Sequence, residues 1–298
     1  MKKVKEIIKQ VYAVFGELCP RTATKILFRK YLGYKLNLKK PVTINEKMQY
    51  LKLFVYKNHP LVTKCADKYA VREYVKECGC EEILVPLLGV WEKADDIDFA
   101  VLPDKFVLKC NHGSGSNIIC KDKGKIDVNE TRQKLTRWLG EDFGKQRVEM
   151  SYKHINRKII AETFIETKSG KAPIDYKIFC AYGVPKFILV ASDRGEQLKF
   201  DFFTPNWEWM PATQDNCPNA GADALMKPNT FNKMLEYAGI LSKPFPLVRV
   251  DFYNEFDKIY FGELTFLDAG GLSPYQPFEY EKKFGEMIDV DISKGIIL

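Results

Sequence analysis

Segments typical of β-strands fill the second half of this chain, and short turns join several of them. The strand patterns cover residues 158–165, 174–182, 186–192, 247–253 and 258–266. Gly183-Val184-Pro185 is a turn signal between two of these segments, and Asn254-Glu255-Phe256-Asp257 separates the last two as in a hairpin. Helical patterns come mostly earlier, with starts near Thr43 and Asp67 and a further stretch at 129–142. Early helices and later antiparallel strands predict an α+β architecture rather than a doubly wound sheet.

Composition excludes several classes of protein. The 298 residues can form one large domain or two to three packed lobes, and 46% hydrophobic with 29% charged residues is typical of soluble globular proteins. The longest apolar runs, such as Phe187 to Ala191, are strand-sized, and Glu6 and Lys9 interrupt any signal-peptide core. The eight cysteines include no Cys-x-x-Cys pair, and the three histidines do not cluster near them. Neither zinc nor a disulfide framework is indicated, so a reducing cytoplasm is the expected setting.

The net charge of +7 is concentrated at the N-terminus. Residues 1–60 hold 14 Lys and Arg against three Glu, giving +11, so the remainder carries −4. A basic segment on an acidic body indicates an acidic partner: nucleic acid, an anionic membrane surface or an acidic polysaccharide. A solvated face without a partner is the alternative. Residues 2–15 show an apolar stripe at helical spacing that either lies on anionic lipid or docks on the body of the protein.

A glycine-rich loop follows a lysine at the end of a strand pattern. Lys109 closes the apolar run 106–108 and opens a loop that contains His112, Gly113, Ser114 and Gly115. Glycines let a backbone approach a ligand closely and turn N–H groups toward an anion, and the lysine adds a positive charge. The pattern therefore indicates a phosphate clamp, although neither the Walker order nor the dinucleotide spacing is present. A glycine-rich hairpin whose lysine merely extends to solvent would look similar.

Carboxylates on the last two strand patterns suggest a metal site. Arg249 and Asp251 share one face of their strand, and Glu263 and Thr265 share one face of the next. Carboxylate oxygens suit Mg²⁺, and Arg249 could stabilise charge on a transferring group. The alternative is a salt bridge on a solvated sheet. Because the flanking residues are apolar, such a face would bury charge without compensation, which favours the functional interpretation.

Two further segments suggest contacts to a nucleotide. Lys177 shares a strand face with Asp175, either as a surface ion pair or as a second phosphate contact. Residues 159–166 form a strand pattern that runs into a polar stretch. Such a connector could offer backbone groups to an adenine edge, with Glu166 on a ribose hydroxyl.

Taken in order, these segments resemble the TupA-like branch of the ATP-grasp enzymes, which is found among cell-surface polysaccharide biosynthesis genes. The resemblance spans roughly residues 40–285 and rests on Asn45-Glu46-Lys47, Ala66 to Arg72, Lys109 to Gly115, Ala161 to Ile165, Asp175-Tyr176-Lys177, Arg249-Val250-Asp251, Gly262 to Thr265 and Ala269-Gly270-Gly271. It implies an ATP-grasp fold in which two mostly antiparallel sheet lobes clasp ATP, with a helical N-terminal segment. The expected division is a basic helical segment 1–60, a lobe 61–160 with the phosphate lysines, and a C-terminal lobe 161–298.

The resemblance also implies roles for individual residues. The triphosphate would be bound by two lysines and the glycine loop: Lys68, Lys109, His112, Gly113, Ser114 and Gly115. The adenine-binding hinge and the ribose contact would come from Glu162, Thr163, Phe164, Ile165 and Glu166. The catalytic cations would be Lys177 and Arg249. Asp251 and Glu263 would hold Mg²⁺, with Thr265 at the place where many ATP-grasp enzymes have Asn.

The activity that the resemblance implies is an ATP-dependent carboxylate–amine ligase of capsule, O-antigen or teichuronopeptide-like biosynthesis. It would activate a uronic acid as an acyl phosphate and couple it to an amino acid or small amine, with an acidic glycan or lipid-linked saccharide as acceptor. Residues 269–273 form a candidate acceptor loop. The expected location is cytoplasmic, either free or peripheral at the inner face of the membrane through residues 2–15, and no nucleic acid partner is expected. A kinase of the same fold acting on a sugar, and a non-catalytic basic adaptor for glycan or lipid, remain as alternatives.

Overall fold

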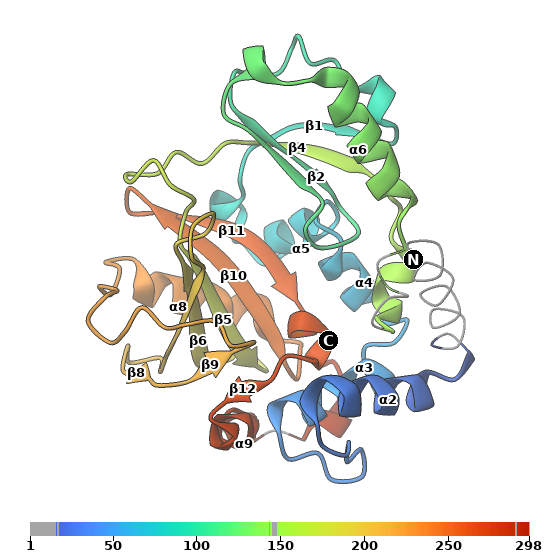
Figure 1. The fold of residues 1–298 in the computed structure, drawn as a ribbon, viewed down its shortest axis with the longest axis vertical. Helices are drawn as coiled ribbons and strands as arrows, with labels where there is room; N and C mark the ends of the chain where they lie inside the picture. The colour runs from blue at the N-terminus through green and yellow to red at the C-terminus, as the bar shows by residue number, and fades with distance from the viewer. Residues whose placement is uncertain (1–15, 17, 143, 145–147, 290, 298) are drawn as a thin grey trace. The chain divides into compact units, whose positions relative to one another are not determined.

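The computed structural model describes residues 16, 18–142, 144, 148–289 and 291–297 (Figure 1). The chain forms two compact units. One is Asn58–Glu166, and the other joins the described residues up to Lys57 with those from Thr167 onward. Both contain helices and antiparallel sheets, so the predicted α+β class is confirmed. The three segments expected from the sequence stay predictions, and the predicted helix at 2–15 lies outside the described residues.

The unit Asn58–Glu166 is built on a four-stranded antiparallel sheet. Its strand order is β1-β4-β2-β3. The strands are β1 (Leu87–Trp91), β2 (Phe106–Cys110), β3 (Asn117–Cys120) and β4 (Ile159–Thr163). The helices are α4 (Pro60–Ala66), α5 (Val71–Glu77), α6 (Val128–Gly140) and the 3₁₀ helices η1 (Glu81–Ile83), η2 (Ala94–Asp96), η3 (Lys123–Lys125) and η4 (Met150–His154).

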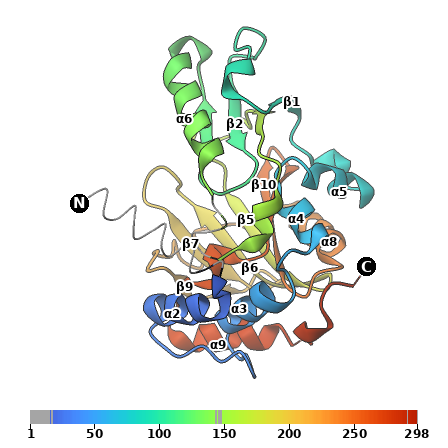
Figure 2. The same cartoon turned by 90° about the vertical axis from the view of Figure 1, so that its right-hand side faces the viewer.

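Helix α6 covers one face of this sheet (Figure 2). It begins after Asp127, whose carboxylate accepts a hydrogen bond from the N–H of Glu130, a typical N-cap. Its fully buried Leu135 packs into a core with Phe106 and Leu108 of β2. The sheet and α6 therefore hold the β2–β3 hairpin, with its glycine-rich loop, on a packed support.

The segment expected to form one helix from Asp67 to Gly79 is different in the structure. Residues 67–70 form a turn, and helix α5 starts only at Val71. The cause is local: the Asp67 carboxylate accepts hydrogen bonds from the N–H groups of Tyr69 and Ala70, at 2.8 and 3.2 Å. Aspartate often competes with helix formation in this way. Lys68 thus lies in a turn and does not open a helix.

The second unit is built on a six-stranded antiparallel sheet of order β11-β10-β5-β6-β7-β8, together with the small β12–β9 pair. The strands are β5 (Asp175–Ala181), β6 (Val184–Ser192), β7 (Lys199–Phe203), β8 (Trp209–Met210), β9 (Thr213–Gln214), β10 (Val248–Glu255), β11 (Lys258–Thr265) and β12 (Tyr275–Gln276). The described helices are α2 (Pro20–Leu32), α3 (Ile44–Phe54), α8 (Phe231–Ser242), α9 (Phe278–Met287), η5 (Asp268–Gly271) and η6 (Ile292–Lys294).

The two faces of this large sheet are covered differently. On one face, Tyr176 contacts the ring of Trp207, which contacts Phe231 of α8. On the other face, Phe187 stacks between Phe179 and Phe284 of α9, with ring centroids 4.3 and 4.2 Å away. Because Lys177 alternates with Tyr176 along β5, the charged residues expected at the site lie on the face opposite α8.

Helices α2, α3 and α9 lie together in this unit (Figure 2). Helix α3 starts where the sequence predicted, and Thr43 caps it in a complete capping box with Glu46. Asn45 Nδ2 donates to Glu281 Oε1 of α9 at 2.7 Å and to Ser273 O at 2.8 Å. These buried hydrogen bonds connect α3 to α9 and to the loop before it, which are more than 200 residues apart in the sequence.

The β10–β11 hairpin contains one irregularity. Its turn residues Phe256 and Asp257 both have positive φ angles, 53° and 57°, as in a tight two-residue turn. Asp251 pairs with Glu263 but Phe252 pairs with Phe261, so Gly262 is an extra residue in β11. This β-bulge sets which side chains of β11 share a face with Asp251.

Candidate active site

Lys109, Glu162 and Arg72 form an ion-pair cluster in the unit Asn58–Glu166. Glu162 Oε2 accepts from Lys109 Nζ at 2.6 Å, and its Oε1 accepts from Arg72 Nη1 at 3.2 Å. The side chain of Glu162 is 10% exposed and that of Lys109 is 21% exposed. Arg72 Nη2 also donates to the carbonyl of Val85 at 2.8 Å. Lys109, which is expected to bind phosphate, is thus held beside β4 by Glu162, and the same carboxylate also pairs with Arg72.

Lys68 contacts the glycine-rich loop directly. Its Nζ donates to the carbonyl of Gly113 at 2.7 Å, and its N–H donates to the carbonyl of Asn111 at 3.1 Å. The two lysines predicted to bind the triphosphate therefore lie at the same hairpin, one at the end of β2 and one against the loop that follows. Of the loop residues, Ser114 and Gly115 are exposed, and Gly115 has a φ of +79°.

Asn111 fixes the base of the loop. It is fully buried, donates from Nδ2 to Asp67 Oδ1 at 2.8 Å and to Asn156 O at 2.9 Å, and accepts from the N–H of Lys158 at 2.7 Å. Burial raises the pKa of Asp67, and its hydrogen bonds oppose that rise. These hydrogen bonds connect the base of the loop to Asp67 and to residues 156–158.

His112 lies inside the same base. Its Nε2 is 3.2 Å from the carbonyl of Glu141, and the residue is 5% exposed. Burial, followed by the charge of Arg157, lowers its pKa. A buried neutral imidazole supports the loop, while Ser114 and Gly115 are the loop residues open to a ligand.

The expected adenine hinge begins within β4. The backbone of Glu162 is paired on both sides, with Leu87 and Val107, and the N–H of Thr163 donates to Pro86 O at 3.0 Å. Phe164, Ile165 and Glu166 follow the end of the strand. Glu166 forms an exposed ion pair with Lys105, at 2.5 Å.

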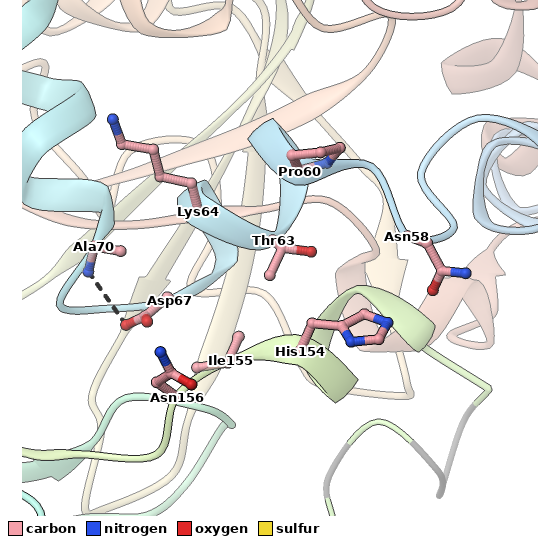
Figure 3. A pocket seen from close by; sticks show the side chains of 9 residues that line it. All are labelled: Asn58, Pro60, Thr63, Lys64, Asp67, Ala70, His154, Ile155 and Asn156. Atoms are coloured by element: carbon pink, nitrogen blue, oxygen red, sulfur yellow. Dashed lines mark hydrogen bonds between the residues drawn. The ribbon is translucent and has the colours of Figure 1, made fainter.

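A pocket of about 550 Å³ lies beside the Lys68 turn in this unit (Figure 3). Thr63, Asp67, His154 and Asn156 bring their polar groups to it. The Asp67 carboxylate in its wall also accepts from the N–H of Ala70 (Figure 3). The turn that carries Lys68 therefore borders an open cavity whose wall includes these polar groups.

Asp251 is the centre of the charged group in the other unit. Its Oδ2 accepts from Lys177 Nζ and from Arg249 Nη2, and its Oδ1 accepts from Arg249 Nε, each at 2.7 Å. The side chains of Lys177 and Arg249 are each 9% exposed and that of Asp251 is 4% exposed. Since cross-strand register pairs Asp251 with both Lys177 and Glu263, the three residues share one sheet face.

Arg249 connects this centre to three further side chains. Its Nη2 is 3.1 Å from Thr265 Oγ1 and 3.5 Å from Glu263 Oε1, and its Nη1 forms an ion pair with Asp268. Burial acts to lower the pKa of Arg249, but the charges of Asp251 and Asp268 raise it above its usual range. The guanidinium therefore keeps its proton and orients the carboxylates around it.

Asp175 is a further buried carboxylate beside this centre. Asp175 lies 3.8 Å from Lys177 Nζ and forms an ion pair with Arg194. Burial raises the pKa of Asp175, and Lys177 and Arg194 oppose the shift. Lys177 and Asp175 thus lie together in a buried network and not in the surface ion pair that was one of the two alternatives, and the role of Lys177 at phosphate stays a prediction.

Glu263 differs from the other carboxylates in its exposure. Its side chain is 32% exposed, and Thr265 Oγ1 donates to its Oε1 at 3.2 Å. Within the described residues, no group of three or more His, Cys, Asp or Glu side chains has the spacing of a metal site. The assignment of Asp251, Glu263 and Thr265 to a metal site therefore stays a prediction.

Sequence reasoning gave no role to Arg72 and Asp268, which hold Glu162 and Arg249. Arg72 lies 90 positions before Glu162 and Asp268 lies 19 positions after Arg249. Their only sequence signal is a charged residue within or just after a segment already assigned to the site.

The ion-pair cluster around Glu162 and the charged group around Asp251 belong to different units.

Comparisons with known proteins identify the family. A search of curated proteins gave no match. An L-amino acid ligase from Bacillus licheniformis is 14% identical with a TM-score of 0.48, over 85% of this chain and 56% of that one. A D-alanine–D-alanine ligase from Bacillus anthracis is 14% identical with a TM-score of 0.45, over 76% of this chain and 68% of that one.

The ADP complex of purK, N5-carboxyaminoimidazole ribonucleotide synthetase, is 13% identical with a TM-score of 0.44. The matched part covers 69% of this chain and 45% of that one, so the chain spans about half the length of some of these structures. The model of the TupA-like ATP-grasp family, in contrast, matches residues 46–289, which is most of the sequence. The chain therefore belongs to the TupA-like ATP-grasp family.

Proposed function

We propose that this protein is an ATP-dependent carboxylate–amine ligase acting in surface polysaccharide biosynthesis. The observation that carries the proposal is the buried group of Lys177, Arg249 and Asp251, with Glu263 and Thr265 beside it on one sheet face. Membership of the TupA-like ATP-grasp family supports the use of ATP.

Stability alone does not account for this group. Burying ions is expensive, and well-packed apolar residues often stabilise a fold as much as a buried ion pair does. Two cations and a carboxylate on a sheet face opposite α8 are therefore better explained by chemistry than by folding. Lys177 and Arg249 supply positive charge where an anionic carboxylate must approach an anionic phosphate.

The residues of this face fit Mg²⁺, because Asp251, Glu263 and Thr265 offer the hard oxygen atoms that this ion prefers. When bound, Mg²⁺ neutralises phosphate charge during transfer. Asp251 shares its oxygens with Lys177 and Arg249, whereas Glu263 is the more accessible carboxylate.

In the other unit, Lys68 and Lys109 would bind phosphate oxygens, and Ser114 and Gly115 would approach the triphosphate from the exposed part of the loop. Lys109 already has an anionic partner in Glu162, which in turn keeps Arg72. A phosphate can therefore replace Glu162 as the anionic partner of Lys109, because Glu162 keeps its ion pair with Arg72. Residues 162–166 would hold the adenine and ribose.

The proposed reaction has two steps. A carboxylate oxygen forms a bond to the γ-phosphorus while the bond to ADP breaks, which gives an acyl phosphate. The amine nitrogen then forms a bond to the acyl carbon, phosphate leaves, and the nitrogen loses a proton. The carboxylate would be a uronic acid of an acidic glycan or lipid-linked saccharide, and the amine an amino acid or small amine. The reaction would take place in the cytoplasm, where ATP is available.

One incubation tests this proposal against its alternatives. The protein is mixed with ATP, Mg²⁺, a panel of uronates and a panel of amines, and products are identified by mass spectrometry. We expect ADP and phosphate only when acid and amine are both present, with an amide of matching mass. A phosphorylated sugar would instead identify a kinase, and the absence of magnesium-dependent nucleotide binding would favour an adaptor. The variant Asp257→Asn, changed in the exposed hairpin turn, should behave in this incubation as the wild-type protein does.

A further inference from the structure

Helix α2 and the loop after it form a surface with a single sign of charge. Residues 18–45 contain no Asp or Glu. The seven Lys and Arg residues of this stretch are all exposed: Arg21, Lys25, Arg29, Lys30, Lys35, Lys39 and Lys40. We call these seven residues the basic face. Such a density of like charge strongly attracts an anionic partner.

The opposite side of α2 is anchored in the protein. Phe28 is fully buried and packs with Leu36 and Leu272, and its ring makes an edge contact with Tyr34 at 4.9 Å. The helix ends at Gly33 in a left-handed conformation whose N–H donates to Arg29 O. The helix therefore has a fixed orientation, and its basic face is held toward solvent.

Three cations of the basic face form one row along the helix. Arg21, Lys25 and Arg29 are spaced four residues apart, and side chains with this spacing are neighbours on a helix surface. Two large apolar side chains accompany them: Leu18, 76% exposed, and Ile26, 45% exposed. Exposed aliphatic groups among cations are typical of helices that lie in a membrane interface, whereas a water-soluble polyanion gains nothing from them.

The basic face also lies outside the part of the chain that defines the family. The family match starts at residue 46, after the whole basic face. The proposed nucleotide chemistry uses residues from 68 onward, so this surface is free to serve a separate purpose.

We propose that α2 and the loop 33–42 dock this protein on an anionic phospholipid surface. The cations contact lipid head groups, and Leu18 and Ile26 enter the boundary between head groups and acyl chains. The interaction of each Lys or Arg with such a surface increases partitioning about fivefold. Reversing three of the seven charges should therefore weaken binding roughly 100-fold or more.

The test uses the full-length protein and sedimentation with two kinds of vesicle, phosphatidylcholine alone and phosphatidylcholine with about one third phosphatidylglycerol. We expect binding to the anionic vesicles only, and weaker binding as salt increases. The triple variant Arg21→Glu/Lys25→Glu/Arg29→Glu should lose its binding to the anionic vesicles. The control Lys121→Glu/Lys125→Glu/Arg137→Glu makes the same change in net charge at exposed positions of the other unit and should bind nearly as the wild type does.

A second variant separates lipid from other polyanions. Ile26→Ser keeps the charge and should weaken vesicle binding about fivefold, because it removes a half-exposed aliphatic side chain that the interface would bury. Equal binding to neutral and anionic vesicles would overturn the proposal, as would wild-type binding by the triple variant. Binding to soluble polyglutamate without vesicle binding, unaffected by Ile26→Ser, would identify a polyanion surface instead. Unchanged circular dichroism spectra and melting temperatures in all variants would show that they are folded, so this test does not depend on the proposed ligase activity.

Discussion

The two carboxylates of the charged sheet face should respond differently to the loss of their charge. Asp251→Asn removes the centre of a buried network in which three donors lie at 2.7 Å. Removing one partner of a buried ion pair costs about 3–5 kcal/mol. The Asn side chain keeps one acceptor oxygen, and Arg249 keeps its ion pair with Asp268. We therefore expect the free energy of unfolding to fall by about 3 kcal/mol.

Glu263→Gln should have little effect on folding. Its side chain is 32% exposed, and its contact with Arg249 is 3.5 Å long. Partly exposed ion pairs of this kind contribute about 0–1 kcal/mol. The two variants should therefore differ by at least about 2 kcal/mol in their free energy of unfolding, which urea denaturation followed by circular dichroism measures.

Both variants should nevertheless lose turnover, because each removes a charge from the proposed Mg²⁺ site. Loss of about 3 kcal/mol of transition-state stabilisation corresponds to roughly 100-fold in rate. The assay is ADP release together with calorimetric titration of nucleotide with and without Mg²⁺, and Asp257→Asn is the control. Wild-type turnover and magnesium dependence in Glu263→Gln would exclude this residue from the site. Equal destabilisation by the two variants would refute the argument from burial.

Three further predictions concern the loops and a buried histidine. Lys109→Ala should raise the dissociation constant for ATP about tenfold or more, because a charged hydrogen bond is lost, and an unchanged constant would count against the phosphate clamp. Gly271→Ala should cost about 2–3 kcal/mol, because its φ is +65° and a Cβ would lie 2.5 Å from Gln49 Nε2. Gly170→Ala, with φ +70° and no atom within 4 Å, should cost only about 1 kcal/mol, and equal costs would contradict the packing argument. The folded pKa of His112 is lowered from 6.5, so its contribution to stability is present above that pH and is lost as pH falls below it. His112→Gln should therefore flatten the decline in stability on acidification, and identical pH profiles in urea titrations would contradict this.

Local signals predicted the hairpins and the helix start at Thr43, although the helix start expected at Asp67 was wrong. The Gly183 turn, the turn after Glu255 and the Thr43 capping box depend on residues a few positions apart. The same holds for β2 and β3, which flank the glycine-rich loop as expected. Short-range chemistry decides these features, so a single sequence is enough to find them.

The contacts that organise the candidate site join residues far apart in the sequence, and the hydrophobic periodicity of the sequence does not predict such contacts. Arg72 meets Glu162 only because β4 lies next to β1 and β2, and Lys177 meets Asp251 only through the register of β5 and β10. The burial of Asp175 likewise depends on a sheet order that no turn signal specifies.

The β-bulge at Gly262 places the side chain of Glu263 on the same sheet face as that of Asp251. In a regular ladder without the bulge, Gly262 would lie opposite Asp251, Glu263 would pair with Val250 and point toward α8, and Leu264 would enter the charged side. Deleting Gly262 would remove the bulge and still leave Glu263 opposite Asp251, whereas closing the bulge with Gly262 retained would turn over the outer half of β11. The pairing of Glu263 with Asp251 therefore depends on the local backbone conformation at Gly262, because the same charged side chains in an unbulged strand would lie on the wrong face of the sheet.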